Sequence, residues 1–511
     1  MIDSNVHGIN LHSKYNPHVE ARRYIESQNL NDESGIYLLI EPGHGYLSQE
    51  LHKIYPNAII LEVHCDTRFQ NPDIFGSLYC WTPDSDVSLK KFLSTHISDF
   101  DLGLIHVVEW KPSLQAYGDS YEQILRTVIS FLQERRGNVH TTGKFGFKWI
   151  SNMCNRVLRM KSVLIPELSG LPILIAASGP SLIRSISIIR RFLSHISLWA
   201  LPSSVNFLMH HDILPDIIIH TDPGYYAKHH LRSISHCNIP LATPLLSAVS
   251  ENERSAIILN NQTLMEQFVI DALDIPSLHT ISHGTVSGTA LFLALVYSDL
   301  PIFFAGLDLS FKDIQGHCRP HSFDSLFLSM CNRNLPLTGM YYSISPRVEE
   351  NFAFNRYSEW FGSLILEKGQ TVYRLFPSDI DIPSFINIHT EKAFRKVMDN
   401  SKRLSQIDGE TGFGSGFSSY QVETNAGRDA LLRYLCALRE QYGTLQSGSY
   451  DISALHLLEE FITFCCSADV FRINTSSWKY GQRLRNADTR ELYDSIETML
   501  DKLERKIEIS G

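Results

Sequence analysis

The sequence predicts an α/β protein in three parts: a small domain with a parallel sheet, a larger parallel α/β domain and a helical C-terminal region. Short apolar runs alternate with stretches of helical periodicity from residue 36 to residue 376, which is typical of strands joined by helices. Glycines follow several of these runs, and after residue 430 only helical periodicity continues. A chain of 511 residues exceeds a single core, and we expect domains at 1–144, 145–400 and 401–511.

Composition and charge exclude several classes of protein. Hydrophobic residues make up 43% and charged residues 20% of the chain, as in ordinary globular proteins. Lys and Arg total 45 against 55 Asp and Glu, so the chain lacks the basic excess that binding to phosphate backbones requires. The 9 cysteines are scattered without a Cys-x-x-Cys pair, which argues against a disulfide framework or a zinc ribbon. Because the chain lacks a basic excess, nucleic acid is not an expected partner.

Neither a secretion signal nor a membrane span is expected. The first residues are polar and form no cationic and apolar signal segment. The most apolar stretch, residues 289–307, is interrupted by Ser298-Asp-Leu-Pro301, so we interpret it as a buried helix, a turn and a strand. The expectation is a reduced, cytoplasmic protein that does not enter a membrane, with its oligomeric state left open.

The first strand, turn, helix and strand match the opening unit of a Rossmann-like domain. Residues 36–40 and 58–62 are apolar strands, and between them lie the glycine turn Gly43-His-Gly45 and a short helix. The glycines allow a tight turn below the helix N-terminus, and Glu62 ends the second strand where a ribose would lie. A third glycine for helix packing is missing, so a Rossmann-like domain that binds no ligand is the alternative.

The central domain begins after an amphipathic helix over residues 145–161. Its apolar strands are expected at 171–177, 198–201, 216–220, 278–282, 302–305 and 371–376, and the helices between them favour a mainly parallel sheet. Residues 409–420 are rich in glycine and serine and are expected to form a linker or a surface loop. Helices over 430–442, 452–465 and 489–507 complete the chain.

Several segments at strand ends of the central domain carry glycines, hydroxyls and acidic residues. They are Ser178-Gly-Pro-Ser-Leu182, His220-Thr-Asp222-Pro-Gly224, Ser287-Gly-Thr-Ala290 and Gly306-Leu-Asp308. Since the carboxyl ends of parallel strands meet at one edge, we expect these segments to share a site for an anion or a nucleotide. Ser287 and Thr289 are also expected to cap the helix that follows them. Simple βα turns, and a helix cap in the case of Asp222, are the alternatives.

These segments, in this order, resemble the motility associated factor (Maf) family of flagellin glycosyltransferases. The resemblance includes Trp149-Ile-Ser-Asn152 and Tyr373-Arg-Leu-Phe-Pro377 and covers roughly residues 145–390. The same segments are similar to a family of bacterial sialyltransferases that bind a CMP-sugar. The resemblance implies a sialyltransferase-like central domain. It also implies an enzyme that moves a nonulosonic acid, of the pseudaminic or legionaminic type, from a CMP-activated donor to Ser or Thr of flagellin.

The resemblance further implies roles for single residues. The donor nucleotide would contact Gly179, Pro180, Ser181, Asp222, Pro223, Ser287, Gly288, Thr289 and Gly306. The acceptor hydroxyl also needs a base, and histidine suits that role. The sialyltransferases carry their catalytic histidine farther downstream, so the candidates here depart from the family: they are His317 and His321 on an expected loop, with Asp308 as the third catalytic residue and His220 and His283 in reserve. A histidine satisfied within the fold or at the surface is the alternative. Arg319 is the candidate partner of the donor carboxylate. The parts that flank the central domain are expected to recognise the protein acceptor.

The chain departs from the family between the first two motifs, where relatives often carry an Asp or Asn. Here the segment is Leu201-Pro-Ser-Ser-Val-Asn206, and Ser203, Ser204 or Asn206 are the candidate substitutes. Asp-x-Asp pairs at 84–86, 99–101 and 379–381 lie away from the motifs, so no obligatory metal or other cofactor is expected.

Two other functions stay open at this point. One is a hydroxymethylpterin pyrophosphokinase that uses ATP and magnesium, because an archaeal group with that activity shares the central domain. The other is a non-catalytic factor that binds flagellin.

Overall fold

The computed structural model describes residues 5–28, 35–69, 78–97, 102, 105–168, 170–234, 237–250, 253, 255–281, 284–344, 357–358, 360–362, 364–365, 370–408, 413–447, 455–465 and 487–510. The chain folds into two compact units. The N-terminal unit comprises Met1–Phe147 with Leu438–Lys502, and the central unit comprises Lys148–Ala437 with Leu503–Gly511.

The N-terminal unit contains a parallel sheet with the strand order β5-β4-β3-β6. Its strands are β3 (Ile36–Ile40), β4 (Ile59–Val63), β5 (Leu78–Trp81) and β6 (Ile105–Glu109). One face packs on α3 (Leu89–His96) and α5 (Asp119–Val157), and the other packs on α1 (Pro17–Ser27) and α2 (Tyr46–Ile54). This strand order is the first half of a Rossmann sheet, which confirms the Rossmann-like prediction.

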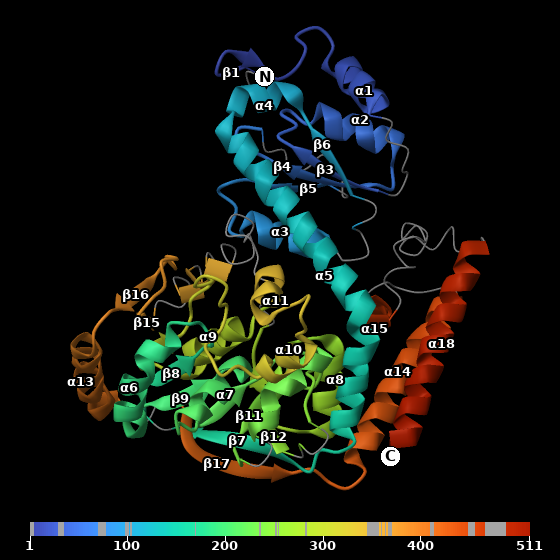
Figure 1. Cartoon of the computed structure of the whole chain (residues 1–511). Helices are drawn as coiled ribbons and strands as arrows, with labels where there is room; N and C mark the ends of the chain where they lie inside the picture. The colour runs from blue at the N-terminus through green and yellow to red at the C-terminus, as the bar shows by residue number, and fades with distance from the viewer. Residues whose placement is uncertain are drawn as a thin grey trace. The chain divides into compact units, whose positions relative to one another are not determined.

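The remaining elements of the N-terminal unit are short or come from the C-terminal region. A ribbon of β1 (Asn5–Val6) and β2 (Ile9–Asn10) precedes α1, and α4 (Lys111–Tyr117) precedes α5. Helices stand where the C-terminal periodicity predicts them: α14 (Ala426–Ser447), α15 (His456–Cys465) and α18 (Ala487–Ser510). α14 and α18 run side by side, with the Tyr442 hydroxyl donating to the Tyr493 carbonyl at 3.0 Å (Figure 1).

The central unit is built on a sheet of eleven described strands in the order β16-β15-β14-β8-β9-β10-β11-β12-β7-β17, with β13 beside β12. The strands are β7 (Ser162–Leu168), β8 (Ile173–Ala176), β9 (Ser197–Ala200), β10 (Ile217–Ile219), β11 (Leu241–Pro244), β12 (Ser255–Asn260), β13 (Leu278–His279), β14 (Ile302–Ala305), β15 (Val372–Leu375), β16 (Phe385–Ile388) and β17 (Phe413–Gln421). All neighbours are parallel except β7 and β17, so the predicted parallel α/β fold is confirmed.

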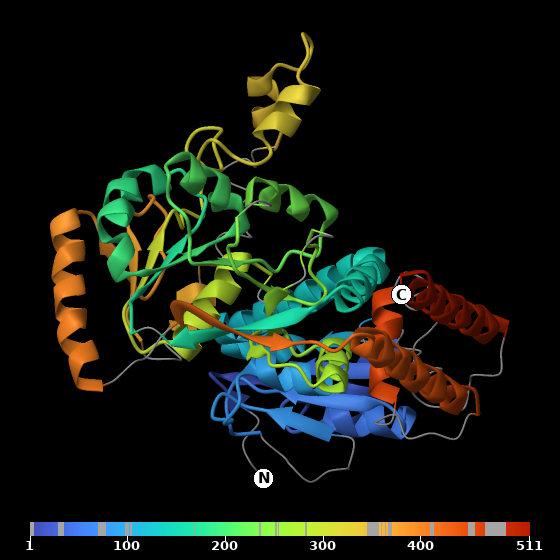
Figure 2. The same cartoon turned by 90° about the horizontal axis from the view of Figure 1, so that it is seen from below.

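Helices cover both faces of this sheet. Alternate residues of β8 point to opposite cores, with Ile175 on the side of α9 (Val286–Tyr297) and Leu174 on the side of α6 (Leu182–Phe192) and α7 (Pro202–His210). α13 (Glu391–Asp408) lies beside α6, where Phe394 packs on Phe192 (Figures 1 and 2). The other helical segments are α8 (Leu264–Leu273), α10 (Asp324–Met330), α11 (Leu337–Ile344), η2 (Leu193–His195) and η3 (Tyr225–Ile234).

The strand order reverses between β8 and β14. From β8 the sheet continues through β9 to β12 on one side, and through β14 to β16 on the other. In open α/β sheets, ligands bind in the crevice at the carboxyl ends of the strands where this reversal occurs. A ligand site is therefore expected at the segments that follow β8 and β14.

The most apolar stretch of the chain is a helix, a turn and a strand, as predicted. It forms α9 and β14, and the Ser298 hydroxyl accepts the Leu300 N–H at 3.2 Å in the turn between them. Within the described part of the chain, no helix combines the length and the apolarity that crossing a bilayer requires.

The prediction of a linker or loop at 409–420 is wrong for the residues that the structure describes there. β17 pairs antiparallel with β7 along the sheet edge, with Tyr420 opposite Val163 (Figure 2). A Cβ on Gly416 would meet the Glu167 carboxylate, so the glycine permits the close approach. Edge pairing uses backbone groups and needs few apolar side chains, which is why a glycine and serine composition concealed this strand. Residues 409–412 lie outside the described residues.

Candidate active site

The segments that follow β8 and β14 contact each other directly. The Gly179 N–H donates to the Gly306 carbonyl at 2.8 Å. A Cβ on Gly179 would lie 2.5 Å from that oxygen and 2.6 Å from the Asp308 carboxyl carbon. Gly306 has a φ of +73°, and a Cβ there would lie 2.9 Å from the Leu182 Cβ. Both glycines therefore serve the contact between two strand ends, which a larger residue would separate.

Asp308 binds the N-terminus of α6. Its carboxylate accepts the Ser181 N–H at 2.8 Å and also accepts the Ser181 hydroxyl. A carboxylate in this position satisfies helix N–H groups and interacts favourably with the helix dipole. The contacts of Gly179, Ser181, Gly306 and Asp308 are thus contacts within the protein. Their binding of a nucleotide, together with Pro180, and the catalytic role of Asp308 stay predictions.

A buried arginine holds the Asp308 segment from behind. Arg374, in β15, is 1% exposed, and its guanidinium donates to the Leu307 carbonyl at 2.8 Å and the Ile380 carbonyl at 2.7 Å. It also donates to the Ser378 hydroxyl at 2.6 Å, and that hydroxyl donates to the Asp308 carbonyl at 2.6 Å. Burial lowers the pKa of Arg374, which the carboxylates of Asp308 and Asp381 counteract. This network fixes the backbone at the end of β14.

The histidine loop, residues 311–323, attaches to the end of β8. The Cys318 N–H donates to the Ser178 carbonyl at 2.6 Å, and the Ser178 hydroxyl lies 2.9 Å from His317 Nδ1. The Ser203 hydroxyl, at the start of α7, donates to the Ser178 hydroxyl at 2.8 Å. A chain of two serines therefore orients the imidazole of His317.

A cavity of about 370 Å³ lies against this loop. Three of the residues predicted for catalysis and carboxylate binding, His317, His321 and Arg319, line it. The remaining lining residues are mostly aromatic or polar: Ser203, His230, Phe311, Ile314, Gln315, Gly316, Phe323, Asp324, Phe327 and Tyr341. Its volume lies within the range of small-molecule pockets, roughly 300–1,000 Å³.

The cavity histidines are neutral at neutral pH. The rings of His317 and His321 stack with centroids 4.7 Å apart, and the ring of His230 lies 5.3 Å from that of His321. Burial, followed by the neighbouring histidines, lowers the pKa of His230 to about 4 and that of His321 to about 3. Burial also lowers the pKa of His317. A neutral imidazole is the form that accepts a proton from a hydroxyl.

His317 and His321 differ in what their nitrogens offer. Nδ1 of His321 accepts the Phe323 N–H at 3.4 Å, so the ring proton resides on Nε2. That Nε2 is buried and has no hydrogen-bond partner in the described part of the structure. His321 therefore offers a hydrogen-bond donor for a ligand oxygen. Nδ1 of His317 lies against the Ser178 hydroxyl, and the role of either histidine as the base stays a prediction.

Arg319 lines the cavity, partly neutralised by Asp324. Its Nε lies 3.8 Å from the Asp324 carboxylate, and its guanidinium stacks over the Tyr341 ring at 4.3 Å. Asp324 also accepts the Tyr341 hydroxyl at 3.0 Å and the His321 N–H at 2.7 Å. The side chain of Arg319 is 41% exposed, which leaves it accessible to an anionic ligand. Its pairing with a donor carboxylate stays a prediction.

Asp222 and Pro223 lie at the end of β10. The Asp222 carboxylate accepts the Gly224 N–H at 2.7 Å, directly before η3. This contact agrees with the alternative in which Asp222 caps the helical segment that follows. Asn152 donates to the Pro223 carbonyl at 3.0 Å and to the Leu246 carbonyl at 3.1 Å, so it ties two strand-end loops together. Asp222 and Pro223 do not line the cavity, and their contact with a ribose stays a prediction.

The predicted cap of α9 is wrong. Thr285 precedes the helix in an extended conformation, and its hydroxyl accepts the Gly288 N–H at 3.0 Å. Ser287 and Thr289 lie inside the first turn, because the helix begins at Val286. Ser287, Gly288 and Thr289 do not line the cavity either, and their phosphate-binding role stays a prediction.

The reserve candidates have other surroundings. His220 is fully buried, and its Nε2 donates to the Ala248 carbonyl at 2.9 Å. Burial lowers the pKa of His220 to about 4. His283 lies outside the described residues. Among the candidate substitutes on α7, Ser203 lines the cavity, whereas the Ser204 hydroxyl donates to the Ala176 carbonyl inside the fold.

Sequence reasoning missed two residues of this region. His230 lies on η3 and lines the cavity, and the signal for it was the pair His229-His230 shortly after a strand-end motif. Arg374 was quoted only as part of a resemblance, although a charged residue inside the apolar strand β15 is itself unusual.

The glycine turn of the N-terminal unit is filled by the protein itself. A Cβ on Gly43 would collide with the His12 ring, whose Nε2 accepts the His44 N–H at 3.0 Å. Glu62, the expected ribose ligand, binds the Ser48 hydroxyl and lies 3.2 Å from His64 Nε2. These contacts favour the alternative of a Rossmann-like domain that binds no dinucleotide.

Comparisons with known proteins give three similarities. Residues 149–313 match a family model described as 6-hydroxymethylpterin diphosphokinase MptE-like. An uncharacterized protein of Treponema pallidum (strain Nichols) is 28% identical over 291 residues, which is 56% of this chain and 64% of that protein. The structure of a Maf glycosyltransferase from Magnetospirillum magneticum AMB-1 is similar over 96% of this chain and 82% of that one, with 11% identity and a TM-score of 0.49.

The family match contains all the strand-end motifs from Gly179 to Asp308 and ends before His317.

Proposed function

We propose that this protein is a glycosyltransferase that moves a nonulosonic acid from a CMP-activated donor to Ser or Thr hydroxyls of flagellin in the cytoplasm. One observation carries the proposal: the imidazole of His317, whose pKa is lowered, lines a cavity beside the point where the strand order reverses. The resemblance of the motifs to the Maf family supplies the donor and acceptor classes.

The reaction needs one base and a good leaving group. Nδ1 of His317 lies against the Ser178 hydroxyl, and the reaction uses the tautomer that carries its proton on Nδ1 and its lone pair on Nε2. The acceptor oxygen forms a bond to the anomeric carbon, the bond from that carbon to the phosphate oxygen breaks, and CMP leaves. The hydroxyl proton passes to Nε2. General base catalysis of this kind typically contributes about 10²–10⁴-fold to a rate.

The other cavity groups suit an anionic sugar. Arg319 offers a guanidinium for the sugar carboxylate, and His321 offers an unpaired Nε2–H for a sugar or phosphate oxygen. Phe311, Phe323 and Tyr341 supply the apolar walls that exclude water and support a ring.

The test is a purified reaction that is read by the intact mass of flagellin. Wild-type protein with CMP-pseudaminic or CMP-legionaminic acid is expected to add sugar masses to flagellin. His317→Ala is expected to lower the rate about 10²-fold or more, because the acceptor keeps its proton. His195→Ala, at an exposed histidine of η2, serves as the matched control with an unchanged rate.

Two outcomes would contradict the proposal. A folded His317→Ala protein with the wild-type rate would remove His317 from the chemistry. Flagellin that is bound but gains no mass with either donor would instead indicate the non-catalytic factor.

A hydroxymethylpterin pyrophosphokinase is the second candidate, favoured by the description of the matching family model. In that reaction the pterin hydroxyl attacks the β-phosphorus of ATP, the bond to the α-phosphate oxygen breaks and AMP leaves. AMP release that depends on hydroxymethylpterin and magnesium would favour this activity over glycosyl transfer.

A further inference from the structure

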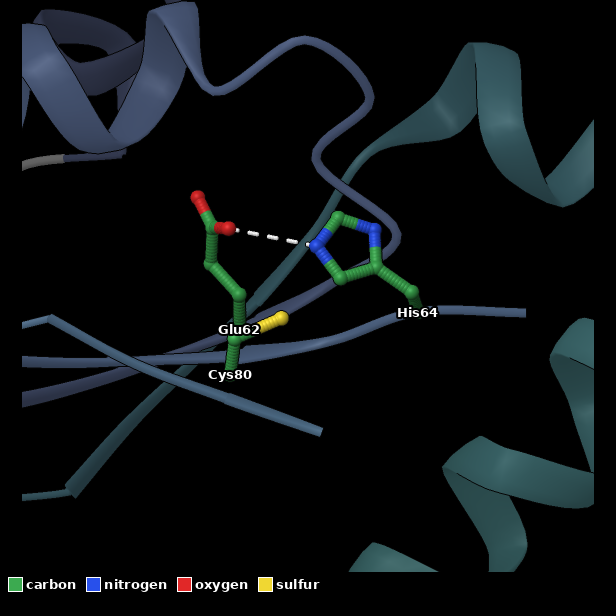
Figure 3. Close-up of side chains that lie close together, drawn as sticks. All are labelled: Glu62, His64 and Cys80. Atoms are coloured by element: carbon green, nitrogen blue, oxygen red, sulfur yellow. Dashed lines mark hydrogen bonds and ion pairs between the residues drawn. The ribbon is translucent and has the colours of Figure 1, made fainter. Parts of the chain in front are cut away.

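Three side chains of different chemistry converge at the carboxyl ends of β4 and β5 in the N-terminal unit. Glu62 and Cys80 are register partners on these adjacent parallel strands, and His64 lies two residues beyond Glu62. All three therefore lie on one side of the sheet. Figure 3 shows the Cys80 sulfur beside the line that joins the Glu62 carboxylate and the His64 ring. One ligand atom from each residue lies within 4.8 Å of those of the other two.

The His64 ring is held as a metal ligand is usually held. Its Nδ1 lies 3.1 Å from the Glu41 carboxylate, while Nε2 lies 3.2 Å from the Glu62 carboxylate. The second oxygen of Glu41 accepts the Cys65 N–H at 2.6 Å, which fixes that carboxylate in turn. A ligating histidine typically donates its other ring N–H to a carboxylate in this way, and this sets the tautomer that presents Nε2 to the metal.

The charges of this cluster need compensation. Glu41 and His64 are 0% exposed and Glu62 is 1% exposed, whereas Cys80 is half-buried. Two buried carboxylates close to one imidazole are costly without a further positive charge. A divalent cation would balance Glu62 and the Cys80 thiolate, leaving Glu41 to accept the Nδ1–H of His64.

We propose that Glu62, His64 and Cys80 bind one Zn²⁺ ion, with water as the fourth ligand. Mixed oxygen, nitrogen and sulfur donors are typical of zinc, and three protein ligands with one open position are within its usual coordination. The half-buried Cys80 marks the side from which the ion enters. The site lies in the N-terminal unit and is independent of the proposed transferase reaction. The expectation that no metal is obligatory concerned the transferase reaction, and this zinc site is separate from it.

The rival state is a proton in place of the metal. In that state the two ring nitrogens of His64 lie against the Glu41 and Glu62 carboxylates, and an imidazolium donates to both.

The first experiment measures metal binding to the full-length protein after treatment with a chelator. Zn²⁺ alone is titrated in competition with a chromophoric chelator, and Co²⁺ is titrated as a spectroscopic probe. We expect one equivalent of either metal per chain, a thiolate-to-cobalt charge-transfer band, and a higher Tm in the presence of zinc. A protein that takes up no zinc and shows no such band would overturn the proposal in favour of the imidazolium.

Matched variants assign the ligands. Cys80→Ser is expected to abolish the band, whereas Cys65→Ser, at the adjacent thiol outside the set, is expected to keep it. Glu41→Gln is expected to weaken zinc binding about 10–100-fold while the band remains, because Glu41 only orients His64. A band that survives Cys80→Ser, or is lost in Cys65→Ser alone, would refute this ligand set. If Cys80→Ser does not fold, the Glu41→Gln titration decides between a site that depends on His64 and one that does not.

Discussion

Two neighbouring regions of the central unit use similar residues in different ways. At the ends of β8 and β14, Gly179, Ser181 and Asp308 bind one another, and the helix N-terminus that an anion could use is taken by the Asp308 carboxylate. In the histidine loop, by contrast, His321 Nε2 is buried without a partner among the described residues, and His317 faces a cavity.

Glycine and hydroxyl motifs at strand ends can serve packing within the protein as well as ligand binding. The glycines of the packed region are explained by contacts with backbone and with the Asp308 side chain, so no ligand is needed to account for them. The cavity carries one buried polar atom, His321 Nε2, that has no partner among the described residues and that a ligand or water would satisfy. We therefore expect substitutions in the packed region to act on stability and substitutions in the cavity to act on activity.

The largest effect is expected from Gly306→Ala in the packed region. Alanine would adopt a φ of +73° and place its Cβ 2.9 Å from the Leu182 Cβ, next to the Ala177 carbonyl. We expect a loss of about 4 kcal/mol in the free energy of unfolding, measured by urea denaturation. Gly284→Ala is the control, with a φ of +69° and no atom within 4 Å of the new Cβ. It is expected to cost about 1 kcal/mol, and equal losses would contradict the packing explanation.

An intermediate effect is expected from acid. Burial lowers the pKa of His220 and His230 to about 4 and that of His321 to about 3. In the unfolded chain these histidines have the ordinary pKa of 6.5, so below pH 6.5 the unfolded chain binds protons that the folded chain does not bind. Stability is therefore intact above pH 6.5 and falls as the pH drops toward 4.

Unfolding free energies at several pH values test this dependence. Each buried histidine is expected to cost about 1 kcal/mol over the first pH unit below its unfolded pKa. His230→Gln should remove one such contribution, whereas His195→Gln, at an exposed histidine, should leave the slope unchanged. An identical slope in both variants would show that the pKa of His230 is the same in the folded and the unfolded protein, against the expectation.

The smallest effect is expected from Ser203→Ala in the cavity. The change removes the hydroxyl that donates to Ser178, while the contact of Ser178 with His317 remains. We expect a rate of flagellin modification about 3–10-fold lower, corresponding to one hydrogen bond of ~1 kcal/mol, with stability unchanged. Ser194→Ala, at an exposed serine of η2, is the control. A loss of stability without a loss of rate would place Ser203 with the packed region instead.

Apolar periodicity determined most of the fold. Fully buried strands such as β8, β9 and β14 read as apolar runs because both faces are covered, and β3 and β4 read in the same way. The strands that escaped prediction include β17, which is rich in glycine and serine and pairs with β7 through its backbone at the sheet edge. Composition does not report backbone pairing, so β17 was visible only in the structure. The apolar strands β7, β11 and β12 also escaped prediction, although their sequences are mainly apolar.

By itself, the sequence determined which residues stand at strand ends, because a strand and the turn after it are local features. It named Asp308, His317, His321 and Arg319, but their partners lie far away along the chain: Ser181 with Asp308, Ser178 with His317, and Glu41 with His64. Only the tertiary structure decided which polar groups satisfy one another and which are left for a ligand. Hydrogen bonding and burial depend on neighbours in space, and the order of parallel strands, not the order of residues, brings those neighbours together.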